Sequence, residues 1–88
     1  MQINQLRAAL AAFDTWSEAQ GHGIRVTLKT GDAISGDYFS LDNREANPIE
    51  GMFRIDAWML GKTGVRCKVS PLYFVEIEQI AAVQIIEL

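Results

Sequence analysis

Apolar residues in the first twenty positions recur every three or four residues, which is the spacing of one face of an α-helix. This apolar stripe consists of Ile3, Leu6, Leu10 and Phe13. Asn4 is expected to cap the start of the helix, and Gly21 to end it in a left-handed conformation. The pattern predicts an amphipathic helix over about residues 3–20, which must lie on an apolar surface.

After residue 23 the apolar period becomes two, which is typical of half-buried β-strands. Ile24, Val26 and Leu28 alternate with polar neighbours, and the segments TGD (30–32) and GKTG (61–64) supply turn residues. Five strands are predicted at about residues 24–30, 33–41, 52–60, 65–77 and 81–88. We therefore expect a single domain, 1–88, that is mainly β with an N-terminal α-helix.

The second predicted strand loses its alternation between Tyr38 and Leu41. Five short antiparallel strands can form a small barrel only when at least one of them curves sharply. Gly36 would allow another strand to approach closely at the bend, and a bulge after Tyr38 would turn Leu41 inward. The break in the pattern therefore predicts the corner of a strongly bent barrel.

The composition narrows the possible functions of this 88-residue chain. Its formal net charge is −3, so clustered positive charge is not a general property of its surface. A single cysteine, Cys67, rules out an intramolecular disulfide and a cysteine-based metal site, and fits a reducing compartment. No stretch reaches membrane-spanning length, and no signal leader is evident, so we expect a cytoplasmic protein.

The stretch VTLKTGDAISGDYFSLD resembles the first signature of the Sm and Sm-like (LSm) proteins. The matching positions are Val26, Leu28, Gly31, Ile34, Gly36, Tyr38, Leu41 and Asp42. The resemblance implies a strongly bent five-stranded antiparallel Sm-like/SH3-like barrel. It also implies a closed ring of subunits, in which the fourth strand of one copy pairs with the fifth strand of the next.

The same resemblance implies a nucleic-acid site in the loop after the second strand. Residues for RNA binding would be Tyr38, Asp42, Asn43, Arg44 and Asn47, with Tyr38 supporting the loop and Arg44 contacting phosphate or stacking on a base. Two departures weaken this expectation. Asn47 lies one position later than the base-contacting Asn of the family, and Glu76 and Ile77 stand where the family has an Arg-Gly pair. A carboxylate cannot replace the guanidinium fork.

The last strands predict self-association. AAVQIIEL is an apolar strand that would aggregate at an exposed edge unless it were paired. The predicted oligomer interface contains Val65, Cys67, Val69, Val83 and Ile85. The alternative is a monomer in which Pro71 and the helix cover these edges, because proline within a sheet requires an edge strand, a strand start or a bulge.

No group of residues suggests catalysis. His22 lacks a second histidine or a nearby cysteine, and no serine has a histidine placed to activate it. We expect no enzyme, no metal and no cofactor. Two functions stay open: a homo-oligomeric Sm-like module associated with RNA, and an acidic protein-interaction module or regulator that binds no nucleic acid.

Overall fold

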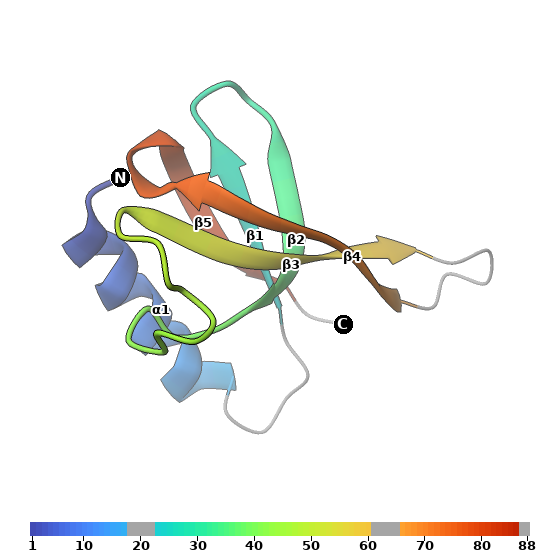
Figure 1. The fold of residues 1–88 in the computed structure, drawn as a ribbon, viewed down its shortest axis with the longest axis horizontal. Coiled ribbons are helices and arrows are strands. Elements are labelled where there is room, and N and C mark those ends of the chain that lie inside the picture. Colours follow the sequence, from blue (N-terminus) through green and yellow to red (C-terminus); the bar gives the residue numbers. More distant parts are fainter. Residues whose placement is uncertain (18–22, 61–65, 87–88) are drawn as a thin grey trace.

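The computed structural model describes residues 1–17, 23–60 and 66–86. Its elements are α1 (Ile3–Ser17), β1 (Gly23–Leu28), β2 (Ala33–Tyr38), β3 (Met52–Leu60), β4 (Arg66–Glu76), the 3₁₀ turn η1 (Ile77–Gln79) and β5 (Ile80–Ile86) (Figure 1). One helix and five antiparallel strands in a strongly bent sheet confirm the predicted fold class. Residues 18–20 of the predicted helix and Gly21, its predicted C-cap, lie outside the described residues.

The start of α1 differs from the prediction. The carbonyl of Gln2 accepts from the backbone N–H groups of Gln5 and Leu6, at 3.0 and 3.1 Å. The Gln5 side chain reaches back and accepts from the Gln2 N–H at 2.9 Å. This is half of a capping box, so Gln2 rather than Asn4 begins the helix. Asn4 lies within the first turn instead.

The sheet has the strand order β4-β3-β2-β1-β5, and β2 changes neighbours along its length. Residues 33–36 of β2 pair with β1, and residues 36–38 pair with β3. Gly36 belongs to both ladders, so the sheet bends there. No ladder joins β4 to β5 among the described residues, so the sheet is bent but not closed into a barrel.

Gly36 is required at the bend because β3 crosses it closely. A Cβ atom added there would stand 2.2 Å from the carbonyl oxygen of Asp56, well inside van der Waals contact. The predicted close approach is therefore confirmed. The predicted bulge after Tyr38 is wrong: β2 ends at Tyr38, and the chain turns at 40–43, where the Asn43 N–H donates to the Ser40 carbonyl at 3.0 Å.

Pro71 lies in an edge strand and at a bulge. Between Asp56 and Trp58 of β3 the register with β4 shifts, because Asp56 pairs with Leu72 whereas Trp58 pairs with Lys68. The extra residues of β4 include Pro71, whose missing N–H would otherwise break the ladder.

The core lies between α1 and the inner face of the sheet. Among the residues whose burial the structure describes, nine form it: Leu6, Leu10, Ile24, Val26, Phe53, Ile55, Val75, Ile77 and Ile80. They follow the helical and strand periods that the sequence shows, so the apolar stripe of α1 covers the concave side of the sheet. The long loop 39–51, between β2 and β3, lies beside α1 (Figure 1).

Candidate functional site

The loop between β2 and β3, predicted to bind nucleic acid, is fastened to the sheet by Asn47. This residue is only 9% exposed. Its amide nitrogen donates to the carbonyls of Ser40 and Phe39, at 2.9 and 3.4 Å, and its amide oxygen accepts from the Arg54 N–H at 2.9 Å. The polar atoms of Asn47 therefore hold the two ends of the loop together.

Asn43 orders the middle of the same loop. Its side-chain oxygen accepts from the N–H groups of Glu45 and Ala46, at 3.2 and 3.3 Å, and its carbonyl accepts from the Asn47 N–H at 2.9 Å. Asn43 thus caps a single helical turn in the manner of an N-cap residue. Ala46 is buried beneath this turn.

Tyr38 joins the sheet to the helix. Its hydroxyl donates to Asp14 of α1 at 2.7 Å, and its ring lies 6.5 Å from the ring of Phe53, centroid to centroid. These contacts place Tyr38 between β2, α1 and the core.

Three residues predicted for RNA binding, Asp42, Asn43 and Arg44, are exposed. The Arg7 guanidinium lies 3.8 Å from the Asp42 carboxylate, whereas Arg44 forms no ion pair among the described residues. Asp42 and Arg44, together with Asn47, line a hollow of about 450 Å³ between the loop and the first turns of α1. The structure therefore brings together three of the five predicted residues, of which Arg44 presents a cation to solvent.

The second departure from the family pattern lies beside this hollow. Glu76, at the end of β4, is exposed, and Ile77 is buried and donates its N–H to the Gly51 carbonyl at 3.0 Å. Glu76 lines a second hollow of about 630 Å³ with Glu50 and Glu78. This end of the site is acidic, as the sequence indicated.

The outer strands of the sheet carry the predicted oligomer interface. Val83 and Ile85 lie half-buried in β5. Cys67 and Val69 lie in β4, but their side chains, like all of Val65, fall outside the described residues. The prediction missed three consecutive apolar residues of β4, namely Leu72, Tyr73 and Phe74, which are 47%, 41% and 38% exposed. Their uninterrupted run after Pro71, at an edge, was the available signal.

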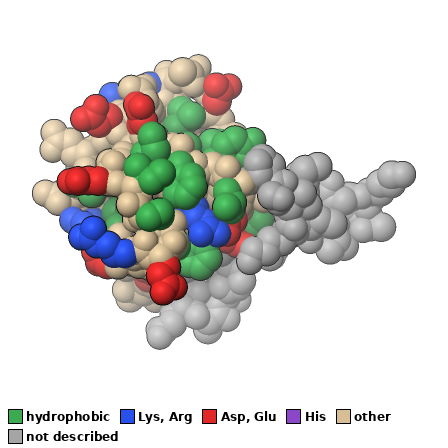
Figure 2. Space-filling model, viewed as in Figure 1, with side chains coloured by type: hydrophobic (Ala, Val, Ile, Leu, Met, Phe, Trp, Pro, Cys, Tyr) green, Lys and Arg blue, Asp and Glu red, His purple; other side chains and the backbone are tan. Residues whose placement is uncertain are grey.

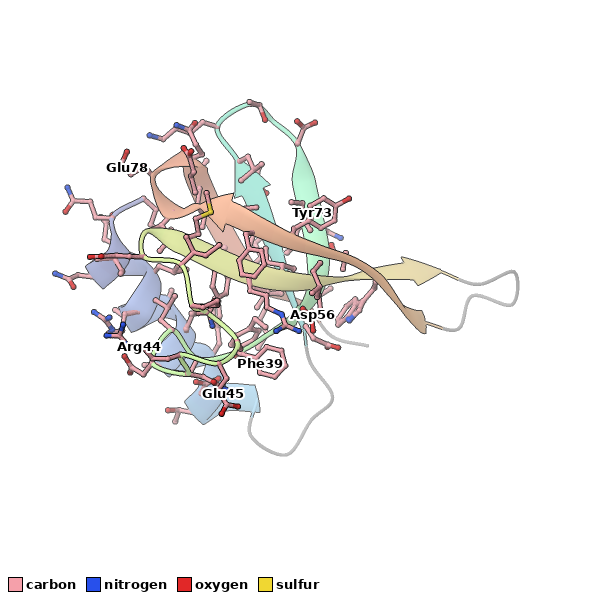
Figure 3. All side chains as sticks on the ribbon, viewed as in Figure 1. Phe39, Arg44, Glu45, Asp56, Tyr73 and Glu78 are labelled. Atoms are coloured by element: carbon pink, nitrogen blue, oxygen red, sulfur yellow. The ribbon has the colours of Figure 1, made fainter. Side chains whose placement is uncertain are left out.

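Figure 2 shows hydrophobic side chains gathered over β3 and β4 on the face toward the viewer, with charged groups around them. In Figure 3, Tyr73 lies over this part of the sheet, and Phe39 and Asp56 lie nearby.

An ion pair that the sequence did not reveal borders these hydrophobic side chains. Arg54 donates to both carboxylate oxygens of Asp56, at 2.8 and 3.1 Å, and its guanidinium carbon lies 5.1 Å from the centre of the Phe39 ring. The hydrogen bonds to Asp56 raise the pKa of Arg54 above its ordinary value. Since Asp37 stands directly opposite Asp56 in the β2–β3 ladder, Arg54 offsets the repulsion between these carboxylates. The guanidinium group of Arg54 is therefore already paired with Asp56 and lies against Phe39.

Comparisons with family models, with curated proteins and with solved structures found no match to this chain. Within the described ranges, no cluster of three or more His, Cys, Asp or Glu side chains is placed to hold a metal ion. The described part also lacks a helix with the length and apolar character needed to cross a membrane. The candidate functional features of the described residues are therefore the loop, the adjoining hollows and the open sheet edges.

Proposed function

We propose that this chain is a non-enzymatic, Sm-like binding module that self-associates through the two open edges of its sheet. The supporting observation is the exposed run Leu72–Phe74 on the edge strand β4. Three large apolar side chains beside unpaired backbone groups form a surface that another strand can cover.

The strand order supplies a second edge for the same contact. β4 and β5 end the sheet on opposite sides, and β5 leaves Ala81 and Ala82 exposed. Pairing β4 of one copy with β5 of the next is a heterologous contact, which generates a closed ring when the rotation per subunit closes. A ring of this kind removes every exposed edge and agrees with the Sm-like resemblance. The exposure of Ala81 and Ala82 favours it over a monomer whose helix covers β5.

The ligand of the assembled module is a protein or RNA, in the cytoplasm, where the lone Cys67 would stay reduced. The internal hydrogen bonds of Asn47 and the carboxylates near Arg44 favour a protein ligand. RNA association stays a prediction that the resemblance implies, with exposed Arg44 as its best support.

The assembly is tested by measuring molar mass in solution with light scattering. We expect a mass several times that of the 9.8 kDa chain. Leu72→Lys should shift the mass to that of one chain, because it places an ammonium group in the contact and would leave it desolvated and unpaired. Ile49→Lys is the matched control: Ile49 is also a large exposed apolar residue, but it lies in the loop.

A wild-type mass of one chain at the highest soluble concentration would refute the proposal. A loss of mass in Ile49→Lys but not in Leu72→Lys would indicate association through the loop instead of the strand edge.

A further inference from the structure

The two hollows beside the loop adjoin each other, and we call the surface that lines them the helix–loop groove. They share five lining residues: Ile3, Glu50, Gly51, Met52 and Ile77. Their volumes, about 450 and 630 Å³, each fall within the range of ligand sites. The groove runs between the first turns of α1 on one side and the loop and η1 on the other.

Apolar side chains make up most of the lining that the two hollows share. Ile3 on α1 lines both hollows and is 41% exposed, and Ile49 on the loop lines the first hollow and is 46% exposed. Met52 is half-buried and Ile77 is buried. Large aliphatic side chains left in water on opposite sides of a hollow gain free energy when a ligand covers them.

The first end of the groove holds both arginines that line it, Arg7 and Arg44. The carboxylates of Asp42 and Glu50 line the same hollow. Arg44 has no ion-pair partner in the described part of the chain, and the contact of Arg7 with Asp42, at 3.8 Å, is long for a salt bridge. Both guanidinium groups can therefore still pair with a carboxylate of a ligand.

The opposite end is anionic. Glu76 and Glu78 line this hollow alone, whereas Glu50 lines both hollows, and none of the three forms an ion pair with any described residue. The Met1 amino group donates to the backbone carbonyls of Ile80 and Glu78, at 2.8 and 3.3 Å, rather than to these carboxylates. Figure 3 shows Arg44 and Glu78 far apart on the side of the molecule where α1 lies.

We infer that the helix–loop groove binds a peptide segment of a partner protein with acidic residues at one end, apolar residues in the middle and basic residues at the other. The acidic end pairs with Arg7 and Arg44, and the basic end with Glu76 and Glu78. Such opposite potentials fix the orientation of the bound segment. A nucleic acid carries negative charge along its whole length and would be repelled by the three glutamates.

This inference does not depend on self-association, because the residues that carry it lie outside the exposed run on β4. The two proposals can therefore fail separately. Measurements on the Leu72→Lys variant, expected to be a single chain, show whether the groove binds its ligand without assembly.

The test is a selection from a display library of random dodecapeptides on the immobilised full chain, followed by fluorescence anisotropy with the enriched peptides. We expect enriched sequences to carry acidic and basic residues on opposite sides of an apolar centre. Arg44→Glu and Glu78→Lys should each weaken binding about three- to tenfold, because each turns an exposed attraction into a repulsion. Arg25→Glu, which reverses an exposed cation on β1 outside the groove, should change affinity less than about twofold.

Several results would overturn the inference. These are the absence of enriched peptides, enrichment of peptides without opposite charges at their ends, and affinities that neither Arg44→Glu nor Glu78→Lys alters. Labelled single-stranded oligouridine is measured in parallel at low salt. If oligouridine binds and Arg44→Glu abolishes its binding while no peptide is enriched, the groove is a nucleic-acid site instead.

Discussion

The centre of the sheet and its β4 edge both carry large apolar side chains, but the exposed fractions of these side chains differ greatly. Ile24, Phe53 and Ile55 in the central strands are fully buried. On β4, Tyr73 and Phe74 stand beside Ile55 and Arg54 in the ladder and are more than one-third exposed. The central strands have neighbours on both sides and a helix over one face, whereas β4 has a described neighbour on one side only.

This difference separates two uses of hydrophobic residues. Burial of the central side chains stabilises the single folded chain by about 25 cal/mol for each Å² removed from water. The exposed residues of β4 contribute this free energy only when something else covers them. The centre therefore stabilises the folded chain, whereas the edge would add stability only in the proposed assembly.

The largest expected effect comes from truncating one aromatic residue in each region. Phe53→Ala should lower the free energy of unfolding by about 4 kcal/mol, because it removes a buried ring and leaves a cavity. Phe74→Ala should lower it by less than about 1 kcal/mol in the single chain, since its ring is already partly in water. Urea unfolding, followed at two protein concentrations, measures both values.

The concentration series separates folding from assembly. Stability gained by association grows with protein concentration, whereas the stability of one chain does not. Phe74→Ala should reduce the concentration-dependent part, and Phe53→Ala should lower stability at every concentration. Equal losses in the free energy of unfolding for both variants in dilute solution would mean that Phe74 contributes to the core of the single chain.

The regular parts of the fold were predictable because their sequence patterns are local. The stripe of α1 and the alternation of Ile24 with Val26 give element type and inward face directly, and Gly36 indicated a close approach. Pro71 indicated an edge or a bulge, and both are present. The missed helix start, at Gln2, depends on the hydrogen bond that the Gln2 N–H donates to the Gln5 side chain, which residue preferences alone do not specify.

The site was less predictable, because its properties depend on residues far apart in the chain. Nothing local in the sequence indicates that the side-chain amide of Asn47 forms hydrogen bonds with the backbone of Ser40 and Arg54. The two hollows also share Ile3 and Ile77, which are far apart in the chain and come to line the same surface only after folding. Motif spacing singled out the loop as a candidate site, but hydrogen bonds across the fold determine which of its atoms face a ligand.

The second-largest expected effect compares the same substitution at two glycines, one at the crowded bend of the sheet and one in an open turn. Gly36→Ala should lower the free energy of unfolding by about 3 kcal/mol, since its Cβ would meet the backbone of Asp56 and force the strands apart. Gly31→Ala should cost only about 1 kcal/mol: nothing lies within 4 Å of the added atom, and its φ of +96° is the only penalty. Thermal unfolding of both variants gives the comparison, and equal losses would show that packing at the bend is not tight.

The smallest expected effect concerns the attachment of the loop to the centre of the sheet. Asn47→Ala should lower the free energy of unfolding by about 2 kcal/mol, because it leaves the Arg54 N–H and the Ser40 carbonyl without their partner in a partly buried place. Asn43→Ala, in the exposed turn of the same loop, should cost about 0.5–1 kcal/mol, typical of a lost cap. Urea unfolding measures both losses, and oligouridine titration of the same variants separates an effect on stability from an effect on binding.

Unchanged stability with a loss of oligouridine binding in Asn47→Ala would show that this amide contacts a base. A loss of stability larger than that of Asn43→Ala would assign Asn47 to the scaffold, leaving ligand contact to the exposed charges that border the groove.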